Sequence, residues 1–581
     1  MNILGISAYY HDAAAAIVCD GVIVAAAQEE RFSRLKNDPG FPRQAIIYCL
    51  AQAGLQPADL DAVVFYEKPF LKFDRIIETY LATAPRGFAS FRRSFPLWIR
   101  EKIRQKAVLC EALGNIAESP EFWRKKIRFS EHHLSHAASA YYPSPFDSAA
   151  VLTVDGVGEW ASASIGVGRG TDLRLLTELH FPHSLGLLYS AFTEYLGFSV
   201  NSGEYKVMGL APYGEPVYQQ LIFRELINLQ EDGSFRLNPA CFDFLTGERM
   251  TNRRFHGLFG APPRRADDVL TDQHRNIAAS IQAVLEECMF RLARQARDIS
   301  GESRLCLAGG VALNCSANGK LRRSGEFDEI WVQPAAGDAG GALGAALAFH
   351  YASSGQPDHL ASRMHSALLG PEYEDAFIGA ELDRLGARYQ KMAPPELIDN
   401  LVERLLRGQI IGWFQGRMEY GPRALGARSI IANPMIADMR ETVNARIKKR
   451  ENFRPFAPAV LEDQAGAWFD GNQQSPFMLF TVQARSEVAA RIPAVVHVDG
   501  SSRIQTVSAQ QNPVFHQLLT AFHQASGCPM LLNTSFNVKD EPIVMSPEDA
   551  LRCMHSAGLD ALAIGNYLVT AAGQTVSAAL A

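Results

Sequence analysis

The stretch NILGISAYYHDAAAAIVCDGVIVAAAQ, residues 2–28, shows the pattern on which the fold of this chain depends. Apolar runs rich in Ile, Val and Ala alternate with loop residues, and Asp20-Gly21 is a strong hairpin-turn signal. The first loop carries His11-Asp12. The stretch therefore predicts a strand, an acidic loop and a β-hairpin, with strands at 2–7, 13–19 and 22–28.

The same pattern returns after residue 149, where an apolar strand runs into Asp155-Gly156 and two further strand-like segments follow. These strands are expected at 150–154, 161–167 and 173–179. Two strand–acidic loop–hairpin units indicate an internally duplicated α/β fold. The design resembles that of the sugar kinase, heat-shock ATPase and actin group, in which each half offers one hairpin loop to the phosphates of a nucleotide.

The segment EHHLSHAAS, residues 131–139, lies between the two units. His132 and His136 are four residues apart, which puts both imidazoles on one face of a helix. Together with Asp155, at a strand end, they form a candidate metal site with nitrogen and oxygen ligands. Gly156 lets a phosphate approach the backbone closely. A metal beside a phosphate loop indicates nucleotide or phosphoryl chemistry.

Two more glycine loops, GGVALN (309–314) and GDAGG (337–341), each follow a predicted strand. The elements expected around them are a helix at 276–299, strands at 304–308 and 330–333, and a helix at 342–351. A strand–glycine loop–helix unit points backbone N–H groups at a helix N-terminus, where anions bind favourably.

Length and composition limit the classes of protein that fit. A chain of 581 residues suggests two or three domains, and a net charge of -6 argues against a nucleic-acid binder. The basic stretch from Arg86 to Arg128 fits either a solvated helical face or a surface for an anionic partner. Nine scattered cysteines without a CxxC pair exclude a zinc ribbon and give no disulfide framework. Without a signal peptide or a membrane-spanning run, a cytoplasmic location is expected.

The C-terminal part is expected to form a second domain, 396–581, after a linker at 353–395. It opens with a predicted helix at 396–407 and a strand at 409–414. Four polar motifs then follow, GRMEYGPRALGARS (416–429), KKRENFRPFAP (448–458), HVDGSSRIQT (497–506) and NTSFN (533–537). Arginines held between Gly and Pro bind phosphate bidentately and stabilise a phosphoryl transition state. The alternative is that they are surface charges or salt-bridge partners.

These motifs, with HHLSHAASAYY, VDGVGEW and GEYKVMGLAPYG, resemble the O-carbamoyltransferases of the NodU/CmcH type over essentially the whole chain. The resemblance implies an N-terminal domain, 1–352, of the actin-like ATPase type (ASKHA, a duplicated ribonuclease-H-like fold). It also implies a smaller, α/β C-terminal domain that is YrdC-like. In this family the C-terminal domain forms carbamoyl-adenylate and pyrophosphate from carbamoyl phosphate and ATP, with Mg as the companion of ATP. The N-terminal domain transfers the carbamoyl group to a substrate hydroxyl and releases AMP.

Site residues carry over by motif. The resemblance implies metal ligands, usually for iron or another divalent ion, at His132, His136, Asp155 and Asp338. It implies nucleotide contacts at Lys36, Gly156, Gly310 and Asn314. The implied adenylate-forming site comprises Arg423, Lys448, Arg454, Arg503, Asn533 and Ser535. His11 is the candidate for positioning or deprotonating the acceptor hydroxyl; hydrogen bonding to a loop is its alternative role.

The leading hypothesis is an ATP-dependent O-carbamoyltransferase acting on a small hydroxylated natural product, such as an antibiotic. Tyr9-Tyr10 is expected to shape the acceptor pocket, and it speaks against an aminoglycoside-type polyamine. Competing hypotheses are carbamoylation of a protein thiol in hydrogenase maturation, tRNA threonylcarbamoylation, and a role as an actin-like nucleotide-dependent scaffold. No nucleic-acid or membrane partner is expected. The resemblance suggests a homodimer, and the sequence leaves the oligomeric state and the acceptor open.

Overall fold

The computed structural model describes residues 1–88, 91–93, 95, 103–247, 249–355, 358–471 and 474–571. Arg100 and Lys102 of the basic stretch, and Gln356-Pro357 of the expected linker, lie outside these ranges. The chain divides into two compact units. Unit 1 comprises Met1–Glu29 and Pro39–Met364, and unit 2 comprises Glu30–Asp38 and His365–Ala581. No helix among the described residues is long and apolar enough to cross a membrane.

The first sheet of unit 1 has the strand order β3-β2-β1-β4-β5. Its strands are β1 (Asn2–Ser7), β2 (Ala14–Cys19), β3 (Val22–Gln28), β4 (Ala62–Phe65) and β5 (Ile127–Phe129). The first three strands pair antiparallel, whereas β4 and β5 run parallel to β1. The three strands predicted from residues 2–28 are thus confirmed to within one residue.

The second sheet of unit 1 repeats this topology with the order β12-β11-β6-β7-β8. Its strands are β6 (Ser148–Val154), β7 (Ala161–Arg169), β8 (Asp172–His180), β11 (Arg304–Ala308) and β12 (Glu329–Val332). Here β6, β7 and β8 are antiparallel, and β11 and β12 run parallel to β6. Two sheets of identical topology confirm the predicted duplicated, actin-like design of the N-terminal part.

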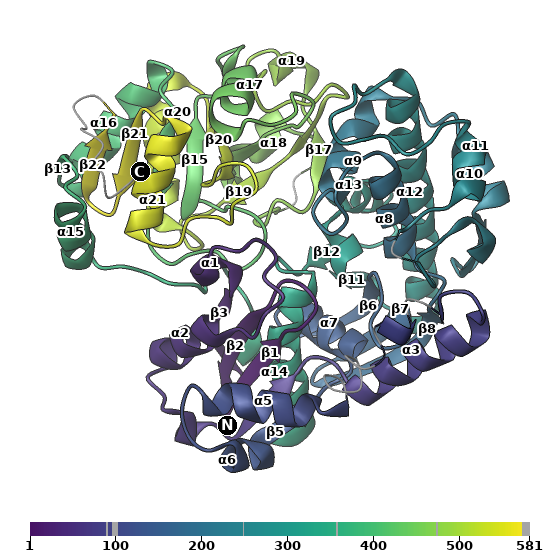
Figure 1. Ribbon diagram of the computed structural model, residues 1–581. Helices are drawn as coiled ribbons and strands as arrows, with labels where there is room; N and C mark the ends of the chain where they lie inside the picture. Colours follow the sequence, from purple (N-terminus) through teal and green to yellow (C-terminus); the bar gives the residue numbers. More distant parts are fainter. Residues whose placement is uncertain are drawn as a thin grey trace. The chain divides into compact units, whose positions relative to one another are not determined.

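The last helix of each half packs on the sheet of the other half. The helix α7 (His132–Tyr141) follows the first sheet but contacts β6, β7 and β11. The helix α14 (Asp338–Ser354) follows the second sheet but contacts β1, β2 and β4. The two helices also contact each other, so they form the middle layers between the sheets (Figure 1). Three of the candidate metal ligands, His132, His136 and Asp338, lie in the N-terminal halves of these helices.

The remaining helices of unit 1 surround the two sheets. They include α2 (Arg43–Ala53), α3 (Pro69–Thr83), α5 (Gln105–Gly114), α6 (Pro120–Lys126), α8 (Leu185–Tyr195), α9 (Glu204–Leu210), α10 (Gln219–Glu225), α11 (Arg253–Phe259), α12 (Asp272–Ser300) and α13 (Cys315–Arg323). The helix predicted at 276–299 is α12, which ends at Gly301 with a φ of 72°. This left-handed conformation favours glycine at a helix C-terminus.

Unit 2 is built on an eight-stranded mixed sheet of order β13-β22-β21-β14-β15-β20-β16-β19. Its strands are β13 (Tyr389–Lys391), β14 (Ile411–Phe414), β15 (Arg428–Ala432), β16 (Ala457–Leu461), β19 (Gln505–Val507), β20 (Met530–Ser535), β21 (Ala561–Ile564) and β22 (Tyr567–Thr570). A two-stranded ribbon of β17 (Thr481–Gln483) and β18 (Ser501–Arg503) accompanies it. The structure thus confirms a second, smaller α/β unit.

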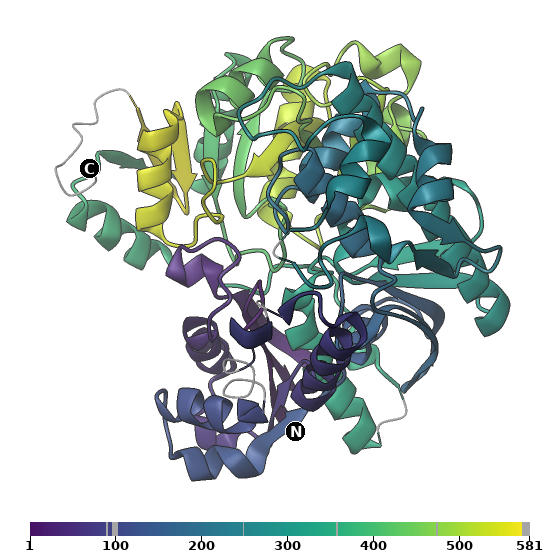
Figure 2. The same cartoon turned by 45° about the vertical axis from the view of Figure 1, so that its right-hand side comes forward.

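Helices of unit 2 cover this sheet. The principal ones are α15 (Asp375–Arg384), α16 (Pro394–Leu406), α20 (Pro513–Ser526) and α21 (Pro547–Ala557). The yellow helix α21 packs beside β21 (Figure 2). Unit 2 resumes at His365, inside the range expected as a linker, and α15 and β13 also fall within that range. The segment Glu30–Asp38, although it follows β3, packs as part of unit 2.

Candidate functional site

The four expected metal ligands come together in unit 1. His132 and His136 lie on α7, Asp155 follows β6, and Asp338 is the first residue of α14. All four are buried, and one ligand atom from each lies within 4.8 Å of all the others. The packing of α7 against α14 and of α7 against β6 therefore assembles the cluster.

The distances within the cluster are short. The Nε2 atoms of His132 and His136 lie 3.0 Å apart, and His132 Nε2 lies 3.3 Å from Asp155 Oδ2. Asp338 Oδ1 lies 3.6 Å from His136 Nε2 and 3.8 Å from His132 Nε2. Two imidazole nitrogens that share one cation at about 2.1 Å are about 3 Å apart when they occupy adjacent ligand positions. The His132–His136 separation fits such a shared cation.

Unsatisfied atoms also fit a cation. Asp338 Oδ1 is buried and has no hydrogen-bond partner among the described residues, although it faces both imidazoles. A buried carboxylate oxygen without a partner is costly, and paired charges or metal ions are the usual compensation. Two imidazoles and two carboxylates form a donor set that suits a divalent transition metal. The residues present therefore fit the divalent metal that the resemblance implies.

The charges of the cluster shift its pKa values. Burial opposes the charged form of His132, but the carboxylates of Asp155 and Asp338 outweigh burial and raise its pKa to about 9. Burial would raise the pKa of Asp338, whereas the facing histidines lower it to about 2. The protonated histidines thus stabilise the carboxylates of Asp155 and Asp338. A metal ion bound by the four side chains would take the place of the protons on the imidazoles.

Outer contacts orient the cluster. Gly310 donates its N–H to Asp155 Oδ1 at 2.8 Å, which leaves Oδ2 facing His132. The Tyr66 hydroxyl donates to Asp338 Oδ2 at 3.2 Å. Glu159 accepts the backbone N–H of His132, the first residue of α7, at 3.0 Å. Such outer contacts are what fix ligand orientation in metal sites.

His11 stands next to the cluster on the loop between β1 and β2. Its Nδ1 lies 3.0 Å from Asp12 Oδ2, and its Nε2 lies 3.9 Å from Asp338 Oδ2. Burial opposes its charged form, but Asp338 and Asp12 raise the pKa of His11 to about 9. The carboxylate of Asp338 thus links His11 to the cluster. The structure thus brings the His11-Asp12 loop next to the candidate metal ligands, which are distant from it in sequence.

The residues expected to contact the nucleotide in unit 1 have different surroundings. Gly156 is half-buried, and its carbonyl accepts from Ser184 Oγ at 2.6 Å. Gly310 is held by Asp155, as described above. Asn314 begins α13 by accepting from Ala317 N at 3.0 Å, and its side chain exchanges hydrogen bonds with Gln282. The pairing with Gln282, on α12, had no local signal in the sequence.

Lys448 is the best-defined side chain of the unit 2 site. Its Nζ donates to Asn537 O at 2.9 Å, to Asn537 Oδ1 at 2.8 Å and to Ser535 Oγ at 3.3 Å. Burial and the nearby charges of Arg450 and Arg454 hold the pKa of Lys448 well below its usual range. Lys36 belongs to the same unit and contributes to this lowering. The structure thus places Lys448 in contact with Ser535 and within electrostatic range of Arg454 and Lys36.

The loop that carries Arg423 is fixed by two side chains that were not expected among the site residues, Glu419 and Gln505. Glu419 Oε1 accepts from the backbone N–H groups of Leu425, Ala427 and Arg428 at 2.7, 2.7 and 3.0 Å. Gln505 donates to Leu425 O at 2.8 Å. Both residues lie inside quoted motifs, but a carboxylate and an amide give no local sign that they bind a loop.

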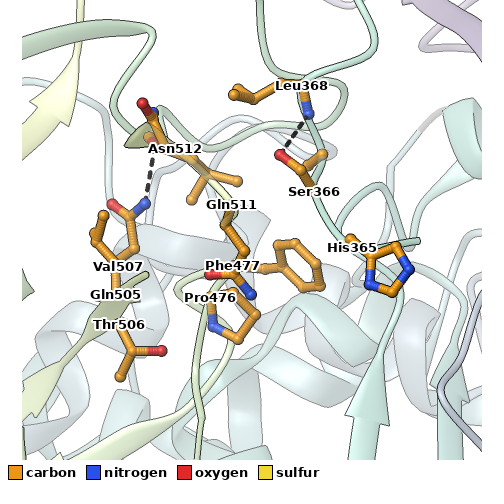
Figure 3. A pocket seen from close by; sticks show the side chains of 12 residues that line it. His365, Ser366, Leu368, Pro476, Phe477, Gln505, Thr506, Val507, Gln511 and Asn512 are labelled. Carbon is orange, nitrogen blue, oxygen red and sulfur yellow. Dashed lines mark hydrogen bonds between the residues drawn. The ribbon is translucent and has the colours of Figure 1, made fainter. Parts of the chain in front are cut away.

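Asn533 and Arg503 lie on strands of unit 2. Asn533 is buried on β20 and donates from Nδ2 to Ala424 O at 3.2 Å and to Gln505 Oε1 at 2.8 Å. Arg503 is half-buried at the end of β18. Gln505 and Asn512 line a pocket of unit 2 together with His365 and Phe477 (Figure 3). Asn533 therefore supports the Arg423 loop in the structure.

Comparison with known proteins places the chain in a family. A model of the carbamoyltransferase N-terminus matches residues 2–347, and a model of the carbamoyltransferase C-terminus matches residues 402–571. The chain belongs to the carbamoyltransferase family. This carbamoyltransferase is 39% identical to the nodulation protein NolNO of Sinorhizobium fredii, over 97% of this chain and 79% of that protein. It is 49% identical to the protein sll1178 of Synechocystis, over 99% of this chain and 97% of that protein.

Among solved structures, HypF of T. kodakarensis is similar with a TM-score of 0.30 and 14% identity, covering 62% of this chain and 49% of that chain. The two family models coincide with the two structural halves of the carbamoyltransferase. The first covers both sheets of unit 1, and the second covers the sheet of unit 2 from β14 onward.

Proposed function

We propose that this carbamoyltransferase is an ATP-dependent O-carbamoyltransferase that modifies a hydroxyl of a small natural product. It would act in the cytoplasm, where ATP is available. Unit 2, taken as a YrdC-like domain, forms carbamoyl-adenylate, and unit 1 transfers the carbamoyl group. The observation that carries the proposal is the buried cluster of His132, His136, Asp155 and Asp338 beside His11, in a chain of this family.

The reaction of unit 2 would have two steps. In the first step, water hydrolyses carbamoyl phosphate to carbamate and inorganic phosphate. In the second step, a carbamate oxygen attacks the α-phosphorus of ATP. Pyrophosphate leaves, and carbamoyl-adenylate remains. Both steps move negative charge, which the cationic groups of Arg423, Lys448 and Arg454 would stabilise. Asn537 and Ser535 hold Lys448 in place through its Nζ.

In unit 1 the acceptor hydroxyl attacks the carbamoyl carbon, the bond to the AMP oxygen breaks, and AMP leaves. His11 is the group that would orient the hydroxyl, and it could take the hydroxyl proton when its imidazole is in the neutral form. Asp12 holds the His11 ring through Nδ1, so that Nε2 points toward the cluster side. The ring orientation is therefore set by the loop that carries it.

The cluster would hold a divalent cation. When bound, such an ion polarises a carbonyl and neutralises charge on a phosphate leaving group. His132 and His136 would supply neutral Nε2 atoms, and Asp155 and Asp338 would supply carboxylate oxygens. Tyr66 and the Gly310 N–H keep these carboxylates oriented. Burial of all four residues excludes bulk water, which protects a labile carbamoyl group from hydrolysis.

Product analysis tests the proposal. The purified protein, given ATP and carbamoyl phosphate, should release pyrophosphate, and Arg423→Ala or Ser535→Ala should abolish that release. Arg552→Ala serves as a control because Arg552 is exposed on α21 and pairs with Glu548. Release of ADP and phosphate in place of pyrophosphate would contradict adenylation. Transfer is then followed as acid-stable radiolabel from carbamoyl phosphate in a hydroxylated acceptor.

A further inference from the structure

The helix α3 of unit 1 buries two basic side chains and exposes two of its large apolar side chains. Its buried residues are Pro69, Lys72 and Arg75, spaced three apart and therefore on one face. Phe70 and Leu81 on the same helix are 67% and 73% exposed. Charged groups are seldom buried unless they are paired or meet a ligand. The inner face of α3 is thus built for polar contacts.

Lys72 on this face is already neutralised. Its Nζ donates to Glu67 Oε2 at 2.6 Å, and both side chains are buried. The same Nζ lies 4.9 Å from the centre of the Tyr10 ring, within cation–π range. The Lys72–Glu67 pair therefore holds Tyr10 and leaves no net charge for a ligand.

Arg75 is different, because it is a buried cation without an ion pair. It is 9% exposed, and its guanidinium lies 5.2 Å above the Phe181 ring. Its Nη1 donates to Gly158 O at 2.8 Å, and it makes no ion pair with any described carboxylate. A guanidinium has five N–H donors, so most of its capacity is left for another partner. The carboxylates of Glu67 and Glu159 stabilise this charge from beyond ion-pair distance, so a ligand oxyanion would be the first anion in direct contact with Arg75.

The position of Arg75 ties it to the proposed transfer site. Its partner Gly158 packs on His132, since a Cβ on Gly158 would lie 2.9 Å from the His132 ring. On the other side, the rings of Tyr10 and His11 are 4.4 Å apart. The charges of Asp338, Asp155 and Arg75 all act on the Tyr10 phenol. The phenol therefore lies within electrostatic range of both the cluster and Arg75.

We propose that Arg75 binds an oxyanion of the acceptor, so that the acceptor is a hydroxylated acid bearing a carboxylate, phosphate or sulfate. The inference rests on the proposed carbamoyl transfer in unit 1 and adds the substrate class. The planar guanidinium, which lies over the Phe181 ring, matches the two oxygens of such a group. The acceptor would reach His11 past Tyr10, which is 43% exposed. The same oxyanion chemistry could come from the phosphate of the nucleotide, and the experiment separates the two sources.

The first measurement locates the oxyanion. Crystals of the full chain are soaked in selenate, and anomalous density is sought at the guanidinium in the wild type and in Arg75→Gln. Density within hydrogen-bond distance of Arg75 that vanishes in Arg75→Gln is the expected result. No selenate at Arg75 overturns the proposal. Metal content and pyrophosphate release are measured on both proteins, so that a folding defect or a failure of adenylation is recognised separately.

The second measurement assigns the source. Carbamoyl transfer is compared for glucuronic acid and its methyl ester, and for shikimic acid and its methyl ester, while AMP affinity is measured by calorimetry. The wild type should prefer the acids at least ~10-fold in kcat/KM, the value of one charge-assisted contact. Arg75→Gln should remove the preference, Arg75→Lys should restore part of it, and AMP affinity should stay unchanged. Arg124→Gln, on the exposed face of α6, is the matched control.

Two outcomes would overturn the assignment to the acceptor. If Arg75→Gln weakens AMP binding by ~10-fold or more, the oxyanion belongs to the nucleotide. If the wild type treats each acid and its ester alike, or accepts neither, the acceptor is not recognised through an acid group at Arg75. In both cases pyrophosphate release still reports on the proposed adenylation, so the two proposals fail independently.

Discussion

Gly344 on α14 packs against Ser135 on α7 so closely that a Cβ at residue 344 would lie 1.7 Å from the Ser135 carbonyl oxygen. Ser135 lies between His132 and His136 on α7, so the helix contact and the metal cluster share one segment. The close approach of the two helices fixes the distance between the two imidazoles and the Asp338 carboxylate. The close contact at Gly344 therefore contributes both to the packing of α7 on α14 and to the geometry of the candidate site.

Gly344→Ala should separate α7 from α14. Overpacking of a core by one methyl group costs about 1–3 kcal/mol, and a contact with rigid backbone puts this change at the upper end. We expect a lower melting temperature and a reduced metal content in the purified variant, measured by calorimetry and by elemental analysis. Gly257→Ala on α11 is the control, because a Cβ there meets nothing within 4 Å. Unchanged metal content in Gly344→Ala would show that the contact between α7 and α14 does not affect the metal cluster.

Asp338→Asn should weaken metal binding without affecting unit 2. The change removes the charge from the buried Oδ1 atom that faces both imidazoles. Changes in outer contacts of metal sites cost about 10–100-fold in affinity, and loss of a ligand charge should exceed this. Carbamoyl transfer should fall with it, whereas pyrophosphate release should persist.

The exposed residue Asp298 on α12 provides the matched control, Asp298→Asn. Metal affinity is measured by competition with a chromophoric chelator. Equal affinities for wild type and Asp338→Asn would remove Asp338 from the ligand set. A parallel fall in pyrophosphate release would show instead that the substitution damages the whole chain.

Local patterns were enough to predict eight of the ten strands in the two main sheets of unit 1, all except β4 and β5. The hairpin at Asp20-Gly21 and the repeat at Asp155-Gly156 depend on turn chemistry and alternation, which act over a few residues. The spacing of His132 and His136 is likewise a property of one helix. The inclusion of Asp338 came from the resemblance, because no local pattern relates it to residues so far away in sequence.

Other features depend on tertiary contacts and could not be predicted in this way. The apolar residues Phe70 and Leu81 would suggest a buried stripe on α3, yet the helix buries Lys72 and Arg75. The segment Glu30–Asp38 leaves unit 1 and packs with unit 2, where Arg31 donates to Gly421 O at 2.8 Å. The burial of Lys72 and Arg75 and the packing of Glu30–Asp38 with unit 2 both depend on contacts with residues distant in sequence.

Glu419 should be a positioning residue for the Arg423 loop. Its Oε1 atom accepts three backbone N–H groups, and each buried donor left unsatisfied costs about 1–3 kcal/mol. Glu419→Ala should therefore destabilise unit 2, and the isosteric Glu419→Gln should keep the fold with a looser loop. We expect Glu419→Gln to lower kcat for pyrophosphate release more than it changes KM for ATP. A variant with unaltered kcat would contradict a positioning role.

Steady-state kinetics of pyrophosphate release give kcat and KM separately, and calorimetry reports the stability of both variants. Glu396→Gln, at an exposed position on α16, is the control. A purely structural role of Glu419 would lower the melting temperature of Glu419→Gln and leave the kinetics of the folded fraction unchanged.

Lys448 should make the stability of unit 2 depend on pH. Burial and neighbouring cations hold its pKa in the folded protein well below the usual lysine value of 10.5. The unfolded chain therefore binds more protons than the folded one at pH values between the folded pKa and about 10.5, and the free energy of unfolding rises with pH in that window. For one proton the slope is at most about 1.4 kcal/mol per pH unit.

Lys448→Met removes this titration. The unfolding free energy of the wild type minus that of Lys448→Met should therefore increase as the pH rises through that window. Urea unfolding followed by circular dichroism, repeated between neutral pH and the upper end of the window, measures the difference. The exposed neighbour Lys449 supplies the control, because Lys449→Met leaves the buried amine in place. If the difference between wild type and Lys448→Met stays constant with pH, the Lys448 amine titrates alike in the folded and unfolded states, and its contacts with Ser535 and Asn537 compensate for its burial.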